Sequence, residues 1–154
     1  MTEKERLKLR FLKYLEELEK HLSILKKDFK ELQEYFPLNE EILEDLIKQP
    51  DTLAVLDQIA YRFIKLQDTL GKAIKLYFTL KGENVDQIPI IDVINLAERY
   101  DFPITEELWW ELRSIRNSIT HDYPDNMEEK AEVLNILREK LEVIEKILEK
   151  LKEI

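Results

Sequence analysis

Residues 11–32 read FLKYLEELEKHLSILKKDFKEL and place an apolar side chain at every third or fourth position. The apolar positions of this repeat are Phe11, Leu15, Leu18, Leu22, Leu25, Phe29 and Leu32. Steps of four and three collect these side chains on one face of an α-helix, and the charged residues are left to face water. The spacing of Thr2 and Glu5 is that of a capping box and predicts the start of this helix, and Pro37 is expected to end it.

Two more long apolar stripes follow in the chain. Their apolar positions are Leu53, Leu56, Ala60, Phe63, Leu70, Ile74 and Tyr77 in the second, and Leu134, Leu137, Leu141, Ile144, Leu148 and Leu151 in the third. Asp51 or Thr52 is expected to cap the second helix, and Gly82 lies where a helix C-terminus places a glycine. The third helix is expected to start with Asn126 as its cap.

Shorter helices are expected between the long ones. They cover residues 40–48, residues 89–100 and a segment that starts at Thr105. No segment alternates convincingly between apolar and polar residues, and the β-branched stretch IPIIDVI would have no partner strand. The sequence therefore predicts an all-α fold, namely an up-and-down bundle of four main helices with one or two short ones, in a single domain over residues 1–154.

Length and composition exclude several classes of function. A chain of 154 residues suits one domain with a core of useful size. It contains 2 glycines and no cysteine, which excludes Gly-rich phosphate loops, thiol nucleophiles and cysteine-ligated metals and fits a reducing compartment. No apolar run approaches the ~20 residues of a membrane span, so we expect a cytoplasmic protein without a membrane partner. The net charge of −9 argues against nonspecific coating of nucleic acid, but not against a local basic site.

Residues 51–81 form the only third of the chain with a positive net charge. The basic side chains of this segment are Arg62, Lys65, Lys72, Lys75 and Lys81. Because the segment is expected to be helical, some of these side chains share a face. That face is either an ordinary solvated helix surface or one edge of a binding site for a polyanion.

Side chains suited to catalysis gather in residues 116–123, RNSITHDY. Histidine transfers protons near neutral pH, as the cleavage of RNA by its own 2′-hydroxyl requires, and a guanidinium donates hydrogen bonds to phosphate oxygens. Arg116 and His121 therefore suit phosphodiester cleavage that needs no metal. The alternative is a polar helix end, where both side chains face the negative end of the helix dipole and Pro124 stops the helix.

This segment resembles the signature of the HEPN family, in which Arg, four arbitrary residues, His, one arbitrary residue and Tyr follow one another. Arg116, His121 and Tyr123 occupy the three fixed places, and Asn117 is also frequent after the arginine in that family. Helix content, length and the late position of the segment are similar as well. The stretch AYRFIKLQDTLGKAI, residues 60–74, looks like the second long helix of family members.

The chain resembles in particular the toxins of HEPN/MNT toxin–antitoxin pairs. That resemblance implies a metal-independent endoribonuclease toxin of a type II-like pair, without a cofactor, whose substrate is RNA. Arg116 and His121 would be catalytic and Asn117 supporting, in a groove between the protomers of a homodimer. The partner would be an MNT-type nucleotidyltransferase antitoxin that can attach AMP to Tyr123.

Two alternatives stay open. A second branch of the family implies a non-catalytic, nucleotidyltransferase-associated binding protein. A purely structural helical dimer, in which residues 116–123 only cap a helix, is the third interpretation.

The spacing of the two catalytic candidates adds a geometric constraint. Residues five apart on an α-helix point about 140° apart, so Arg116 and His121 cannot share a face of one helix. Either the helix ends near Thr120 and His121 turns back, or a second chain completes the pair. One histidine cannot be acid and base at the same time, which favours a two-fold dimer with two of them in one groove.

The sequence also predicts where two tryptophans and the second histidine lie. Trp109 and Trp110 are neighbours and point about 100° apart on a helix. One is expected in the core, and the other at a dimer or partner surface or stacked on a base. His21 lies beside the first apolar stripe and is expected at the surface or its boundary.

Overall fold

The computed structural model describes residues 1–120 and 126–154, which form six α-helices and no strand. The helices are α1 (Glu3–Glu31), α2 (Glu40–Lys48), α3 (Pro50–Leu80), α4 (Ile90–Arg99), α5 (Glu106–Ile119) and α6 (Met127–Leu151). A 3₁₀ turn over Gln33–Tyr35 lies between α1 and α2. The predicted all-α bundle is therefore confirmed, with α2 and α4 as its short helices.

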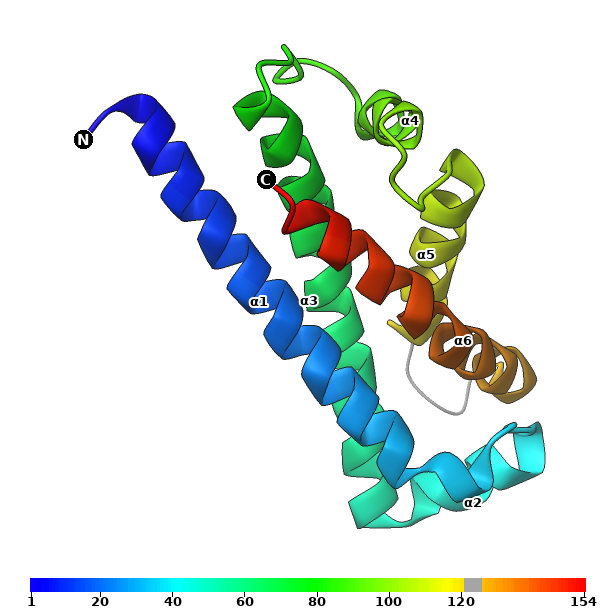
Figure 1. Cartoon of the computed structure of the whole chain (residues 1–154). Coiled ribbons are helices and arrows are strands. Elements are labelled where there is room, and N and C mark those ends of the chain that lie inside the picture. The colour runs from blue at the N-terminus through cyan, green and yellow to red at the C-terminus, as the bar shows by residue number, and fades with distance from the viewer. Residues whose placement is uncertain (121–125) are drawn as a thin grey trace.

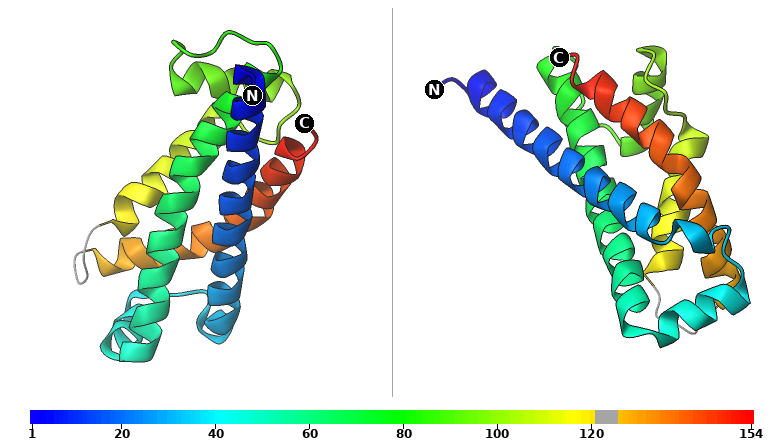
Figure 2. Two further views of the ribbon diagram at one scale, coloured as in Figure 1. Left: turned by 90° about the vertical axis from the view of Figure 1, so that its left-hand side faces the viewer. Right: turned by 60° about the horizontal axis from the view of Figure 1, so that its bottom comes forward.

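The four main helices run alternately in opposite directions, so that both termini lie at the same end of the molecule (Figure 1). α1 and α3 pack against each other more extensively than any other pair. α3 lies between α1 and α5, and α6 contacts α1, α3 and α5 (Figures 1 and 2). α3 is thus the central helix, and its side chains contact both the core and α5 at the edge of the bundle.

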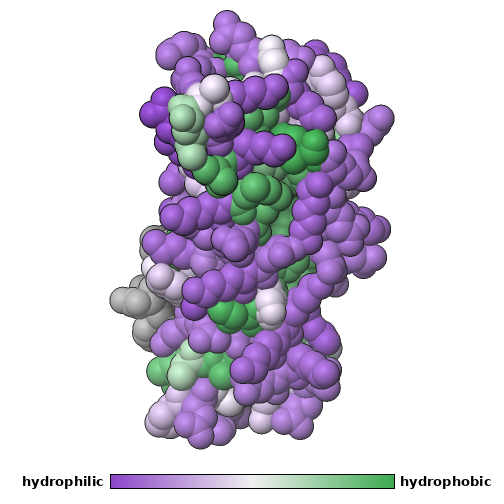
Figure 3. Space-filling view, turned by 60° about the vertical axis from the view of Figure 1, so that its left-hand side comes forward, coloured by the Kyte–Doolittle hydropathy of each residue, from purple (hydrophilic) through white to green (hydrophobic). Residues whose placement is uncertain are grey.

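The core is built from the predicted stripes. Every residue of the first stripe and of the third is buried. The largest fully buried side chains of α1 and α3 include Phe11, Leu18, Leu25, Phe63, Leu70, Ile74 and Phe78. Figure 3 shows that polar side chains cover most of the outer face in that view and leave only a narrow apolar run between them. The amphipathic pattern of the sequence therefore matches the observed burial.

At the helix starts, one expectation from the sequence is confirmed and another is wrong. The capping box is present, because the Glu5 amide donates to Thr2 Oγ1 at 3.1 Å and the Thr2 amide donates to Glu5 Oε2 at 3.3 Å. Asp51 and Thr52 do not cap α3, which begins at Pro50. A proline at the first helical position needs no hydrogen-bond acceptor for its nitrogen, and Thr52 instead donates to the carbonyl of Leu46 at the end of α2.

Other helix ends also differ from the sequence-based expectation. Asn126 makes no side-chain cap for α6 and has a positive φ of 53°, a left-handed conformation that asparagine tolerates. α1 ends at Glu31, before Pro37, because the chain tightens into the 3₁₀ turn. Gly82 follows α3 with a φ of 90°, which confirms its expected place after the helix.

His21 is buried rather than at the surface, which corrects the expectation from sequence. Its side chain is 9% exposed, and its Nδ1 lies 3.2 Å from Nη1 of Arg62 on α3. A guanidinium can only donate, so Nδ1 is the acceptor and the ring proton is on Nε2. Burial first, and then the positive charge of Arg62, lower the pKa of His21. The neutral ring is therefore the form that fits between α1 and α3.

We expect this contact to make the fold sensitive to acid. In the unfolded chain His21 takes up a proton near its ordinary pKa of about 6.5, whereas in the folded chain it does so only at lower pH. Between these two values the unfolded state binds more protons, so the free energy of unfolding falls as the pH falls through that window. Urea unfolding at about pH 5 and pH 7.5 measures the loss.

The matched variant for this prediction is His21→Gln, which keeps an acceptor for Arg62 but cannot be protonated. It should lose less stability than the wild type between the same two pH values. An equal loss in both proteins would mean that groups other than His21 control the acid response.

No helix in the described part of the chain is both long enough and apolar enough to cross a membrane.

Candidate functional site

α5 brings the described residues of the RNSITHDY segment to the edge of the bundle. The hydroxyl of Thr105 accepts from the Leu108 amide at 3.0 Å and so caps the start of the helix. The buried face of α5 consists of Trp109, Leu112 and Ile115. Arg116 follows directly after the last of these. The packing of the buried face therefore fixes the direction in which Arg116 points.

An open groove lies between α3 and α5, with α4 at one side. Its volume is about 460 Å³. The lining residues are Gln67, Asp68 and Gly71 from α3, Ile90 from α4, and Trp109, Arg113, Arg116 and Asn117 from α5. The two guanidinium groups on one wall make this groove a suitable place for an anion.

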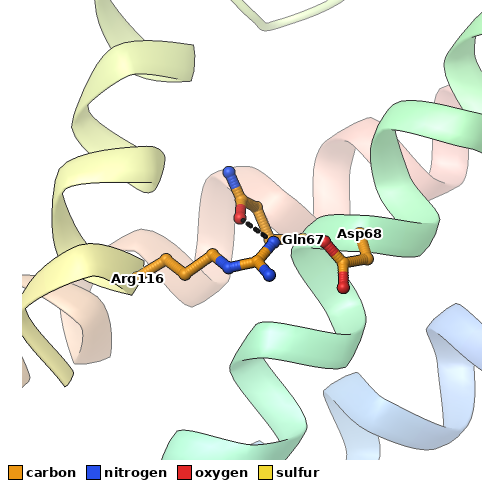
Figure 4. Close-up of polar contacts among 3 residues, drawn as sticks. All are labelled: Gln67, Asp68 and Arg116. Carbon is orange, nitrogen blue, oxygen red and sulfur yellow. Dashed lines mark hydrogen bonds and ion pairs between the residues drawn. The ribbon is translucent and has the colours of Figure 1, made fainter. Parts of the chain in front are cut away.

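Arg116 crosses the groove from α5 to α3 (Figure 4). Its Nη1 donates to Oε1 of Gln67 at 3.1 Å and forms an ion pair with the carboxylate of Asp68. Gln67 is 4% exposed, so its amide is held rigidly in the wall. These contacts use Nη1 alone, and a guanidinium has three further N–H groups, on Nε and Nη2, that can donate to phosphate oxygens.

Gly71 allows α3 and α5 to approach closely at the floor of the groove. A Cβ atom at this position would lie 3.2 Å from Cη2 of Trp109, tighter than an ordinary contact. Trp109 is 4% exposed and fills the space that a side chain at Gly71 would take. Trp110, its neighbour in sequence, is 51% exposed. The expectation of one core tryptophan is therefore confirmed for Trp109, and the role expected of the exposed Trp110 stays a prediction.

The structure brings only part of the sequence-predicted site together. Arg116 and Asn117 both line the groove. His121 and Tyr123 lie outside the described residues. α5 ends at Ile119, with Thr120 as its C-cap, so the helix does end near Thr120, as the first of the two alternatives from the sequence supposed.

Asp68 and Arg113 were missed by the sequence analysis. Gln67 is a polar residue within the apolar stripe of the second long helix, and a buried polar side chain needs a hydrogen-bond partner. Asp68 follows Gln67 directly, and Arg113 precedes Arg116 by one helical turn. Both signals were present in the sequence, but the partner of Gln67 lies 49 residues away and only the tertiary fold identifies it.

The basic residues of α3 do not form one continuous patch. Arg62 turns inward to His21. Lys75 donates to the carbonyl oxygen of Asp86 at 3.0 Å, and the Lys81 ammonium lies 5.5 Å from the centre of the Tyr77 ring. Lys65, Lys72 and Lys81 are all exposed, and the Lys65 ammonium lies 5.6 Å from the centre of the Tyr61 ring. The contacts of these five side chains thus differ from one residue to the next, and the choice between a solvated face and a polyanion site stays open.

A second hollow, between α2 and α6, has the opposite charge. Its volume is about 600 Å³, and its carboxylates are Glu40, Glu41, Glu44, Glu128 and Glu132. Such a surface repels phosphate, in contrast to the guanidinium groups of the groove between α3 and α5. Within residues 1–120 and 126–154 no three His, Asp or Glu side chains are placed to hold a metal ion.

Comparison with protein-family models, with curated proteins and with solved structures finds no significant match to this chain.

Proposed function

We propose that this chain is a metal-independent endoribonuclease of the HEPN type, acting as the toxin of a toxin–antitoxin pair. The observation that supports the proposal most is the position of Arg116. Its guanidinium enters a groove that also contains Arg113 and Asn117, at the end of the helix that leads directly to His121. A phosphodiester bound there meets fixed positive charge on the helix that precedes His121 in the sequence.

In the proposed reaction the chain supplies two functions. Arg116 donates hydrogen bonds to the non-bridging phosphate oxygens and stabilises the charge that builds up on them. His121, which lies outside the described residues, takes the 2′-hydroxyl proton or protonates the leaving 5′-oxygen. The 2′-oxygen then attacks phosphorus, the bond from phosphorus to the 5′-oxygen breaks, and a cyclic phosphate remains. Asn117 supports the site as a further polar group on the same wall.

A homodimer is part of the proposal, because one His121 cannot take up a proton and deliver another in the same step. Two protomers would place two copies of Arg116 and His121 in one groove. Mixing Arg116→Ala with His121→Ala protomers tests this arrangement. A composite site predicts that the mixed dimer differs from both parent proteins in its cleavage rate.

Asp68 shapes the site in the absence of RNA. Its carboxylate pairs with Arg116 and holds the guanidinium in the groove. The same negative charge repels a phosphate that approaches Arg116. Both side chains are partly exposed, at 44% for Asp68 and 33% for Arg116, so water screens their attraction and phosphate can compete for the guanidinium.

Removing the charge of Asp68 should therefore strengthen RNA binding. In Asp68→Asn the amide oxygen still accepts from Arg116, while the repulsion of phosphate disappears, so we expect several-fold tighter binding. Asp68→Ala loses the acceptor as well and should cleave RNA more slowly. Fluorescence anisotropy of labelled single-stranded RNA, measured with the His121→Ala protein, reports the affinity. Weaker binding by Asp68→Asn would refute this role.

Regulation by a nucleotidyltransferase antitoxin completes the proposal. AMP attached to Tyr123, which lies outside the described residues, would add a negative charge and a bulky base beside the site, and both oppose the entry of RNA. Mass spectrometry of the co-expressed pair should find the adenylate on the peptide that contains Tyr123. Complete neutralisation without that adduct would mean that the antitoxin acts by binding alone.

The ion pair of Arg116 with Asp68 is the observation that favours the alternative function. A guanidinium engaged by a carboxylate can be purely structural, as a non-catalytic nucleotidyltransferase-associated binding protein would require. Cleavage of RNA by the purified chain separates the two functions.

A further inference from the structure

Three residues of α5, Trp110, Arg113 and Asn117, are exposed and follow one another at steps of three and four. These steps align them along one side of the helix, here called the α5 strip. Arg113 and Asn117 also line the groove, whereas Trp110 extends the strip beyond it. The strip therefore starts beside Arg116 and leads away from the proposed cleavage site.

The Trp110 side chain is unusual in its setting. Trp110 is 51% exposed, whereas its neighbour Trp109 is 4% exposed and packs in the core. The packing of the bundle therefore gives no reason for a large apolar ring at position 110. The Cζ atom of Arg113 lies 5.8 Å from the centre of the Trp110 ring. A guanidinium at that distance from an indole forms a cation–π contact, which orients both groups.

The spacing along the strip suits successive nucleotides. Trp110 and Arg116 are six residues apart, which is about 9 Å along the helix axis and about 120° around it, so their side chains are separated by more than 9 Å. Stacked nucleotides rise by about 3.4 Å each, so at least two of them fit between a phosphate on Arg116 and a base on Trp110. Arg113 lies between the two and can neutralise the intervening phosphate. Glu106 and Glu107, one turn before Trp110, would repel the strand and end the strip there.

We propose that the α5 strip is a nucleotide subsite for single-stranded RNA, in which Trp110 stacks on an unpaired base and Arg113 binds the adjacent phosphate. This inference rests on the proposed ribonuclease function and specifies its substrate. A base must leave a duplex to stack on a side chain, so the strip selects single strands. Stacking accepts every base, so the subsite contributes affinity rather than sequence preference.

The test uses the full-length His121→Ala protein, which should bind RNA without cutting it, and labelled ten-residue oligomers of uridine or adenosine. Trp110→Ala should weaken binding of both oligomers roughly ten-fold, whereas Trp110→Phe should retain most of the affinity. Arg113→Gln should lower the slope of log Kd against log salt concentration by about one. Leu12→Ala and Arg10→Gln, exposed substitutions on α1, are the matched controls and should bind like the parent protein.

Intrinsic fluorescence gives a second readout. Stacking on an RNA base should quench the exposed Trp110, and this quenching should disappear in Trp110→Phe while the buried Trp109 stays unaffected. Unchanged RNA affinity in Trp110→Ala, with wild-type cleavage present, would overturn the subsite and leave the ribonuclease in place. Conversion of Trp110→Ala to a monomer in sedimentation would assign the side chain to an interface instead. Absence of RNA binding by the parent protein would overturn both proposals.

Discussion

Substitution of Arg116 or His121 by alanine is expected to lower the rate of RNA cleavage on the order of 10²-fold or more. Arg116 provides the positive charge that the phosphorane needs, and its place in the groove is fixed by Gln67 and Asp68. His121 provides the proton transfer that a guanidinium cannot perform, because arginine does not lose its proton in proteins. Each loss should be close to complete, since neither residue can replace the other.

The structure offers matched controls for both substitutions. His21→Gln changes the only other histidine, which is buried between α1 and α3, and Arg10→Ala removes an exposed arginine of α1. Neither should change the rate of cleavage at neutral pH. Circular dichroism must show an intact helical signal in every variant. A normal rate in His121→Ala would refute the role of His121 in proton transfer. A normal rate in Arg116→Ala would mean that Arg116 and its ion pair with Asp68 serve the fold and not the reaction.

Phe78→Ala is expected to lower the free energy of unfolding by about 3–5 kcal/mol. The ring is fully buried at the end of α3. Its centre lies 5.1 Å from the ring of Tyr77, 5.2 Å from that of Tyr100 and 5.8 Å from that of Phe102. Truncation leaves a cavity among these rings, which hold the segment around α4 against α3.

Urea unfolding followed by circular dichroism measures this loss. Leu12→Ala, at a side chain that is 44% exposed on α1, is the control and should change stability by less than about 0.5 kcal/mol. Because α4 and α5 are adjacent, Phe78→Ala should also weaken RNA binding before the chain unfolds. A loss of stability below about 1 kcal/mol would show that the aromatic cluster does not anchor this segment.

The fold was predictable because α1 and α6 each bury a single face. A helix with one buried face shows a regular stripe in its sequence, and both stripes were found at the right positions. α3 is different, since the consecutive residues Leu76, Tyr77 and Phe78 are all buried. Helices on several sides cover it, so its single predicted stripe underestimates its burial.

The candidate site was predictable only where its residues lie together in the sequence. Arg116 and Asn117 were identified from a local motif, and both line the groove. Asp68 and Gln67 belong to the site because α3 and α5 pack together, and no local spacing contains that information. His21 was misplaced for the same reason: its burial depends on Arg62, 41 residues later, whose side chain satisfies the ring nitrogen.

Incubation of the purified protein with a single-stranded RNA and with its 2′-deoxy counterpart, in EDTA, tests the central claim most directly. The account predicts that the RNA is cut into fragments with a 2′,3′-cyclic phosphate, that the deoxy strand stays intact, and that EDTA changes neither result. Cleavage of the deoxy strand, cleavage that stops in EDTA and returns with a divalent cation, or no cleavage of any RNA would contradict it.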